Sequence, residues 1–483
     1  MKTPRTALLL SLLALATLAG PLAHAVEERR STAADQTGLA VTIYNGDLAL
    51  VKDARKVRLG GGENRLAWRE VSARMQPETA LLRALDGGRL TLLEQNFDFD
   101  LLTPQKLLEK SVGGAVRVFR TPPHDGAETV ENATVLAAND GVVLQFADRV
   151  ETGVPGRLGF AGVPPGLRDR PTLAMLVDAG AAAQPDTARA LELSYLTGGL
   201  SWKADYVAEL SGDEGGLDLN GWVTLTNTSG TAYPDARLQL VAGEVNRVAP
   251  DLAKMAMAQR TLAMAEAAPG MKEEGLFEYH LYTLERPTSI GDNQTKQVAL
   301  LSARDVKVRK EYRLDGGDWY YGGQYGEIGQ RLKPAVTLEF ANKGRDLGIP
   351  LPKGIVRVYK KDAAGRAQFI GEDRIDHTAK GETVRLKLGE AFDITADKKQ
   401  TDFQKVAGVI GRSGVIETAY QLEIRNAKNE PVRVKVVEPM PGEWQILQSS
   451  LPHRKETAHL ASWDVPVPAE GKTVLTWRAR VKF

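Results

Sequence analysis

Hydrophobic and polar positions alternate with a period of two over much of the chain after residue 38. In an extended strand this period places every second side chain on the same face, so it predicts strands with one buried face. The clearest examples pair an apolar face with a basic face and span residues 306–309, 384–388 and 432–436. Glycine (47 residues) and proline (24 residues) separate such segments and leave little room for helices. The pattern therefore predicts an all-β fold of antiparallel sheets.

Turn residues between the alternating segments sharpen this prediction. Asp140-Gly141 separates two short apolar runs, and this dipeptide tolerates the positive φ angles of a tight hairpin. Three segments share the order strand, asparagine, strand, and their asparagines are Asn227, Asn342 and Asn426. This order is typical of the edge of an immunoglobulin-like sandwich. Internal duplication and convergence on the same turn chemistry both explain the similarity.

Breaks in the pattern suggest where domains end. A run of small residues followed by a proline, 179–185, resembles a linker. We therefore expect tandem antiparallel β-sandwich (immunoglobulin-like) domains with few short helices. The expected segments are a signal peptide at 1–25, an N-terminal β domain at 26–185, a central β-sandwich domain at 190–345 with irregular insertions at 251–275 and 315–329, and a C-terminal immunoglobulin-like β region at 346–483.

The first 25 residues have the features of a secretory signal peptide. Lys2 and Arg5 precede an apolar run from Ala7 to Ala19, and Ala23-His24-Ala25 supplies small residues for cleavage. The run is shorter than the roughly 20 residues that a spanning helix needs. No later stretch has the length and apolar character of a spanning helix. The sequence predicts cleavage near Ala25 and a periplasmic or secreted protein.

Composition and charge then exclude several classes of function. The chain has no cysteine, which excludes disulfides, a thiolate nucleophile, cysteine-ligated zinc, iron–sulfur clusters and lipid attachment through cysteine. Its 62 lysines and arginines balance 61 aspartates and glutamates, so no overall basic field exists to attract nucleic acid. Phosphate-binding, dinucleotide-binding and zinc-protease motifs are absent. We expect no cofactor.

Several blocks resemble one bacterial family. Residues 195–206, 221–227 and 347–359, together with 44–51 and 96–104, are similar to segments of the "domain of unknown function 4139" family. The resemblance implies an exported all-β protein distantly related to mucoidy inhibitor A, a name that hints at a role in the cell envelope. Those relatives often place a long coiled coil before the shared domain, and this chain lacks sustained heptads. The family has no established catalytic residues, so the resemblance assigns none here.

The strongest candidate site is a stretch that concentrates four aromatic residues among five glycines between Asp315 and Gly326. Flat rings on a surface loop suit stacking on a sugar or contact with another protein. The alternative is a hairpin tip whose rings fold back on their own sheet. The candidate ligand-binding residues are Trp319, Tyr320, Tyr321 and Tyr325.

Three weaker candidates involve metal ligands. Asn96, Asp98 and Asp100 would share one face of a strand, but a hard cation needs six or more oxygens, so an ordinary strand with a wet polar face is favoured. The acidic segment 372–377, which ends in a histidine, is interpreted as a solvated hairpin. Clustered methionines at 255–271 could bind Cu(I), but flexible apolar filling is the favoured interpretation. No metal is expected.

These observations favour an exported, non-enzymatic cell-envelope protein that binds a protein or glycan partner through the loops of its β-sandwiches. The alternative is an exported hydrolase of glycan or peptide, with carboxylates contributed by separate strands. Such carboxylates come from distant strands and have no local sequence signature, so the hydrolase alternative stays open at the level of the sequence.

Overall fold

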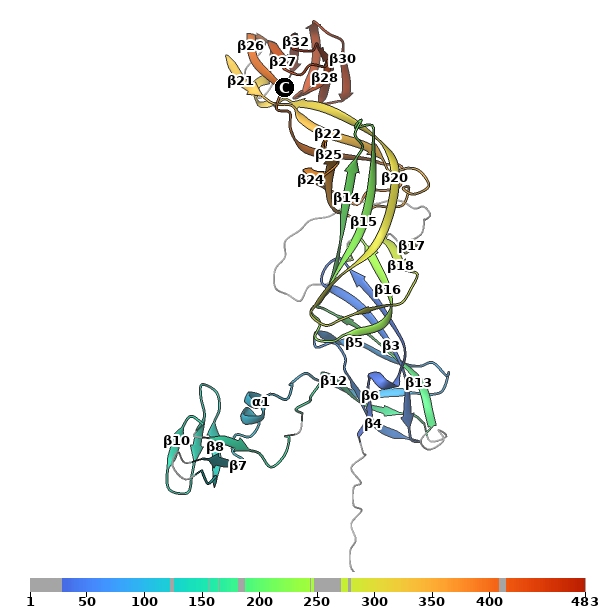
Figure 1. The fold of residues 1–483 in the computed structure, drawn as a ribbon, viewed down its shortest axis with the longest axis vertical. Helices are drawn as coiled ribbons and strands as arrows, with labels where there is room; N and C mark the ends of the chain where they lie inside the picture. Colours follow the sequence, from blue (N-terminus) through green and yellow to red (C-terminus); the bar gives the residue numbers. More distant parts are fainter. Residues whose placement is uncertain are drawn as a thin grey trace, which may run out of the picture. The chain divides into compact units, whose positions relative to one another are not determined.

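The computed structural model describes residues 28–121, 126–154, 156–164, 166–180, 187–243, 245–246, 271–276, 279–407 and 414–482. Within them the fold is nearly all β (Figure 1), which confirms the predicted all-β class. The short helix α1 (Pro104–Glu109) and the 3-10 turns η1 (Ala33–Asp35) and η2 (Trp319–Tyr321) interrupt the strands. The predicted signal peptide, the end of the predicted linker and three of the clustered methionines lie outside the described residues.

The chain divides into two compact units. Unit 1 comprises residues 1–37, 54–71 and 82–192, and unit 2 comprises residues 38–53, 72–81 and 193–483. Two short N-terminal segments thus join the unit that contains the second half of the chain. The domain borders expected from the sequence stay a prediction.

Unit 1 contains two smaller sheets. One has the order β1 (Glu28–Ser31), β4 (Glu63–Arg69), β12 (Thr172–Asp178) and β6 (Thr91–Asp98). The other has the order β10 (Val150–Thr152), β9 (Val143–Gln145), β8 (Thr129–Ala137), β7 (Ala115–Arg120) and β11 (Arg157–Gly159). The predicted Asp-Gly hairpin joins β8 to β9, which pair antiparallel. Apolar residues of β7, β8 and β9 form a buried cluster with Leu108 of α1.

Three further sheets contain the strands that lie wholly or partly in unit 2. The first has the order β17 (Met271–Leu276), β18 (Tyr279–Leu284), β16 (Tyr233–Ala242), β2 (Gln36–Tyr44), β3 (Leu48–Leu59), β13 (Thr187–Thr197) and β5 (Met75–Ala84), with β19 (Thr288–Ile290) on β16. The second has the order β24 (Ala367–Ile375), β23 (Gly354–Lys361), β14 (Leu200–Leu210), β15 (Gly216–Asn227), β20 (Gln294–Asp315), β28 (Val432–Pro439), β31 (Leu460–Val467) and β30 (His453–Thr457). In addition, β22 (Ala335–Ala341) pairs with β20, and β25 (Thr383–Glu390) pairs with β22.

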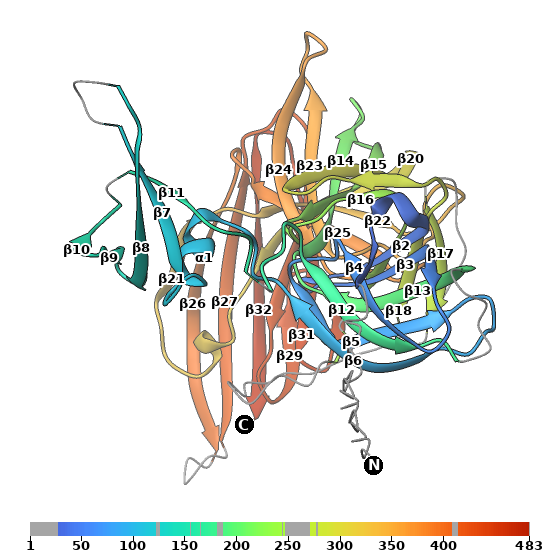
Figure 2. The ribbon, with the colours of Figure 1, turned by 90° about the horizontal axis from the view of Figure 1, so that it is seen from below.

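The third sheet has the order β21 (Glu327–Leu332), β26 (Ile394–Ala407), β27 (Val415–Asn426), β32 (Gly471–Lys482) and β29 (Glu443–Ser449). Figure 2 shows its long strands β26, β27 and β32 side by side, as their pairing requires.

The three asparagines of the repeated sequence pattern perform the same task. The side-chain amide of Asn227 donates to the carbonyls of Thr231 and Gly291, and its oxygen accepts from the Ser229 N–H. Asn426 repeats this arrangement: its amide donates to the carbonyls of residues 430 and 468, and its oxygen accepts from the N–H of residue 428. Asn342 makes equivalent bonds across a longer loop. Each asparagine is buried, so these bonds satisfy backbone groups that would otherwise be desolvated.

The strands that follow the three asparagines also share one kind of pairing. Strands β16, β23 and β28 each pair parallel with a strand from earlier in the chain, namely β2, β14 and β20. Strand, asparagine turn and parallel-paired strand therefore recur three times in unit 2.

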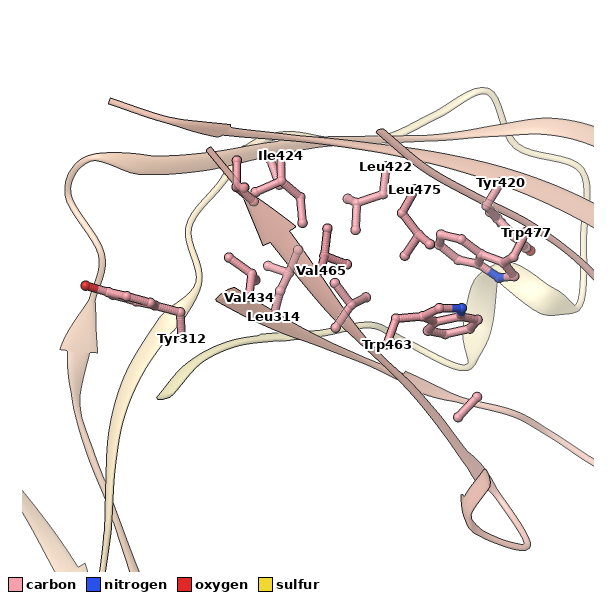
Figure 3. Packing of buried hydrophobic residues seen from close by; sticks show 14 of the residues in the cluster. Tyr312, Leu314, Tyr420, Leu422, Ile424, Val434, Trp463, Val465, Leu475 and Trp477 are labelled. Carbon is pink, nitrogen blue, oxygen red and sulfur yellow. The ribbon is translucent and has the colours of Figure 1, made fainter. Parts of the chain in front are cut away.

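The C-terminal sandwich packs the third sheet of unit 2 against β28 and β31. Alternate residues of β32 point inward and are almost fully buried, among them Leu475 and Trp477. Tyr420 stacks on Trp477 with ring centroids 5.2 Å apart, and Trp463 lies 5.2 Å from Trp477. Figure 3 shows these three rings gathered at one end of the apolar core. This aromatic end supports the candidate site.

Candidate functional site

The aromatic loop, residues 315–329, begins where β20 ends and returns as β21. It divides its four rings between core and solvent. Tyr320 and Tyr321 are buried in the C-terminal sandwich, with 2% and 0% exposure. Trp319 and Tyr325 remain 55% and 40% exposed. Tyr320 and Tyr321 therefore fold back on their own sandwich, as the alternative interpretation expected, whereas Trp319 and Tyr325 lie at the surface.

A buried ion pair lies beneath the loop. Lys398 of β26 and Glu438 of β28 come from opposite sheets of the sandwich, and their side chains are 4% and 2% exposed. The Lys398 Nζ lies 2.5 Å from Glu438 Oε1 and 2.5 Å from the Tyr320 hydroxyl oxygen. The Tyr320 hydroxyl donates to Glu438 Oε2, and the Tyr321 hydroxyl donates to the same oxygen at 3.2 Å. The loop thus satisfies the carboxylate that the two sheets bury.

Electrostatics explains how the sandwich accommodates these buried charges. Burial lowers the pKa of the Lys398 ammonium, and the Glu438 carboxylate opposes that shift. Burial, reinforced by the Glu438 charge, raises the pKa of the Tyr320 hydroxyl far above its ordinary value, so it stays a proton donor. The ammonium also lies 4.1 Å from the Tyr320 ring centroid and 5.0 Å from that of Trp477, where the ring faces attract a cation. A buried charge pair needs such additional partners to offset its desolvation.

Backbone bonds hold the loop along its length. The Gly316 N–H donates to the Val437 carbonyl at 2.7 Å, and the Gly317 N–H donates to the Tyr320 hydroxyl at 2.8 Å. Farther along, the Tyr325 N–H donates to Gln400 Oε1 at 2.5 Å. A Cβ at position 316 would collide with the Tyr320 hydroxyl and the Glu438 carboxylate, so this close approach requires glycine. Gly317 is also closely packed, because a Cβ there would meet the Trp319 ring nitrogen at 2.6 Å.

The two exposed rings form one surface. Trp319 and Tyr325 lie with centroids 5.1 Å apart and planes at 89°. The Trp319 ring also meets the buried Tyr320 ring edge to face, at 5.2 Å. Exposed aromatic surface held on a fixed base loses little conformational entropy when a partner covers it. This pair can therefore stack on a flat or C–H-rich surface.

The second candidate from the sequence, the acidic strand Asn96–Asp100, has a different environment. Asp98 accepts from Arg168 Nε at 2.9 Å, and Asp100 lies 3.1 Å from Lys110 Nζ. The same Arg168 guanidinium donates two bonds to Glu28, and this contact lowers the pKa of that carboxyl. Among the described residues, no cluster of three or more potential histidine or carboxylate ligands has a geometry suited to a metal ion. The structure therefore does not gather further ligands around Asn96, Asp98 and Asp100.

The acidic segment 372–377 is likewise engaged locally. Glu372 lies 3.2 Å from Arg357 Nε, and Asp373 accepts from the Lys387 N–H at 2.7 Å. The His377 ring nitrogen lies 3.3 Å from the Lys353 N–H. These contacts belong to the β23–β24 region and its neighbours.

The sequence reasoning missed Lys398 and Glu438, although a signal was present. On β26 the inward positions are Ile394, Ala396 and then Lys398. On β28 the inward valines at 432, 434 and 436 are followed in the same phase by Glu438. A charged residue that continues an apolar alternation faces the core, where it needs an opposite charge.

A family model described as Domain of unknown function (DUF4139) matches residues 191–483. The match includes the aromatic loop and the buried ion pair, whereas the acidic strand precedes it. No curated protein matches the chain. Among the described residues, no helix has both the length and the apolar character needed to cross a membrane.

Proposed function

Because the chain belongs to the DUF4139 family, whose description names no activity, we propose its function from its own residues. We propose that it is an exported, non-enzymatic protein of the cell envelope that binds a protein or glycan partner. The aromatic loop is the proposed contact surface, and the exposed pair Trp319 and Tyr325 is the proposed point of attachment. No cofactor takes part in this proposal.

The observation that carries the proposal is the exposure of a large indole on a rigid base. Trp319 leaves 55% of its surface to solvent, although its two chain neighbours on one side, Tyr320 and Tyr321, are buried. Aromatic residues are enriched at binding hot spots because they bury a large area with few rotatable bonds. The ion pair beneath the loop fixes this surface in advance of binding.

The alternative, a hydrolase with carboxylates from separate strands, has no specific observation in its favour. One surface hollow, beside Arg309 and Phe340, contains Glu339 as its one carboxylate, which accepts from Arg309 and Arg385. A second hollow, beside Trp444, contains Glu443 as its one carboxylate. Glycoside hydrolysis ordinarily uses two carboxyl groups that flank the scissile bond. Neither hollow provides that pair.

A binding screen tests the proposal. Immobilised peptidoglycan, exopolysaccharide and extracted periplasmic protein are each incubated with the wild-type chain, with Trp319→Ala and with Trp222→Ala. Trp222 is a matched control, because it is an exposed tryptophan (40%) on β15. We expect Trp319→Ala to reduce retention on one of the three materials at least tenfold and Trp222→Ala to leave it unchanged. Equal retention of both variants on every material that binds the wild type would mean that the aromatic loop is not the contact surface.

Export is tested separately. The intact mass of protein released by osmotic shock should correspond to a chain that begins at Val26. A full-length mass that begins at Met1 in that fraction, or recovery only with the cell interior, would contradict export.

A further inference from the structure

A second surface feature of the C-terminal sandwich is independent of the aromatic loop. A hollow of about 550 Å³ lies among residues of β29, the β30–β31 hairpin and the end of β32. Strands β29 and β30 are the edge strands of their sheets, so the hollow opens where the two layers of the sandwich end. Its volume falls in the range of sites that bind small molecules, roughly 300–1,000 Å³.

One wall of the hollow is a fixed indole. The Trp444 Nε1–H donates to the Ala458 carbonyl at 2.6 Å, which ties β29 to the β30–β31 hairpin. The ring is partly buried and packs against the apolar core of the sandwich. Its position is therefore set before any ligand arrives, and it lines the hollow.

The charged groups of the hollow favour an anion. Lys455 and Lys482 oppose one carboxylate, Glu443, which gives these three groups a formal charge of two minus one, or +1. Lys482 lies 3.1 Å from Glu443, in a pair that is largely exposed. Lys455 has no carboxylate partner among the described residues, and its Nζ lies 4.8 Å from the Trp444 ring centroid.

The residues on either side of Lys455 on β30 do have ion-pair partners. Arg454 pairs with Asp464 at 2.7 Å, and Glu456 pairs with Lys435 at 3.2 Å. The strand thus neutralises the charges on either side of Lys455 and leaves its ammonium at the hollow. A flexible lysine over a partly exposed ring can turn toward a ligand, because a surface cation–π contact is weak.

We propose that this hollow binds an acidic sugar, a uronic acid unit of a saccharide. The sugar carboxylate would accept from Lys455 and Lys482, and a C–H face of the pyranose ring would pack on the Trp444 indole. An indole and a cation side by side fit a ligand that is apolar on one face and anionic at its edge. The carboxylate supplies the counter-charge that Lys455 lacks within the described part of the protein.

The test measures calorimetric affinity for trigalacturonate and for its fully methyl-esterified form at low ionic strength. The two ligands share a skeleton and differ in charge. We expect the free acid to bind at least tenfold more tightly than the ester, and added salt to remove most of this difference. Lys455→Gln should weaken binding of the acid about tenfold, and Trp444→Phe should weaken both ligands.

Lys472→Gln is the matched control, because it removes the same charge from β32 at a residue that pairs with Glu423. Equal affinity for acid and ester, or equal weakening by Lys472→Gln and Lys455→Gln, would overturn the proposal. Tighter binding of galactose 6-phosphate than of galacturonate would overturn the carboxylate assignment. Trp319→Ala should leave uronate binding unchanged, so failure at this hollow and failure at the aromatic loop are distinguishable.

Discussion

The aromatic loop and the acidic strand are two candidate sites with similar local signals and different surroundings. In both, candidate side chains recur at short spacing. In the aromatic loop, Glu438 lies 118 residues beyond Tyr320 and draws two of four rings into the core. In the acidic strand, Arg168 lies 70 residues beyond Asp98 and neutralises it. The comparison teaches that local spacing determines which face a side chain occupies, whereas partners distant in sequence determine whether that side chain remains available.

The largest difference between the two regions should appear when the buried ion pair is broken. Glu438→Gln leaves the Lys398 charge without its counter-charge inside the sandwich, so we expect unit 2 to lose about 3–5 kcal/mol of unfolding free energy. Urea unfolding measures this loss. Adding Lys398→Met in the same chain should recover part of it, because the second change removes the unpaired charge. A loss below about 1 kcal/mol for Glu438→Gln would contradict a structural role for the pair.

The C-terminal sandwich beneath the aromatic loop should lose stability at high pH, and the region around the acidic strand should lose stability at low pH. Burial raises the pKa of Tyr420 from 10.0 to about 12 in the folded state. The stability from the neutral phenol is therefore complete below pH 10 and is lost as the pH rises toward 12, by about 2.7 kcal/mol for a shift of this size. The lowered pKa of Lys398 acts in the opposite direction, because the unfolded chain still binds the lysine proton near pH 10.5 when the folded chain has released it. This contribution is common to the wild type and to Tyr420→Phe, so it cancels in their comparison.

Beside the acidic strand, the Arg168 guanidinium lowers the pKa of the Glu28 carboxyl on β1 below its ordinary 4.5. The stability from this ionised carboxylate is therefore present above pH 4.5 and is lost as the pH falls below it. Urea unfolding at pH 9 and 11.5 checks the alkaline limb. Tyr420→Phe should show a shallower decline there than the wild type. Parallel declines would mean that Tyr420 ionises alike in the folded and unfolded chains.

Breaking the acidic strand should have a smaller effect. Arg168→Met leaves the partly buried carboxylates of Glu28 and Asp98 without their shared counter-charge, at an expected cost of about 1–2 kcal/mol. Hydrogen exchange on peptides of β6 and β12 measures the loss within unit 1. Arg170→Met, which removes a neighbouring arginine, serves as the control and should change protection little. Equal effects of the two variants would mean that Arg168 stabilises unit 1 no more than Arg170 does.

The smallest effect on stability is expected at the exposed ring. Trp319→Ala removes an indole that is 55% exposed, so the unfolding free energy should fall by less than about 1 kcal/mol. Thermal unfolding compared with that of Trp222→Ala checks this value. A loss comparable with that of Glu438→Gln would mean that Trp319 serves the core rather than a partner.

Much of the architecture follows from local rules. The period of two gives the strands, Asp140-Gly141 gives a hairpin, and the three asparagines mark turns that the structure builds alike. The sequence also located the aromatic loop. It could not divide the four rings between core and solvent, because that division depends on Lys398 and Glu438, which arrive from two other strands. Phase along β26 and β28 indicates that both charges face inward, but only the fold brings them together.

The acidic strand shows the same limit of prediction from sequence. Alternation predicts that Asp98 and Asp100 share a polar face, but β6 ends at Asp98 and Phe99 is 63% exposed. Arg168 and Lys110 reach the two carboxylates through pairings that no local pattern specifies. The hollow beside Trp444 likewise depends on two edge strands that meet only in the folded sandwich.

Hydrogen exchange across the aromatic loop tests the central claim most directly, namely that a buried ion pair holds the loop as a rigid base for two exposed rings. The amides of Gly316, Gly317 and Tyr325 donate to groups of the sandwich or the loop itself. We expect peptides spanning 315–326 to exchange slowly in the wild type and in Trp319→Ala, and at least tenfold faster in Glu438→Gln. Rapid exchange of these peptides in the wild-type chain would contradict the account.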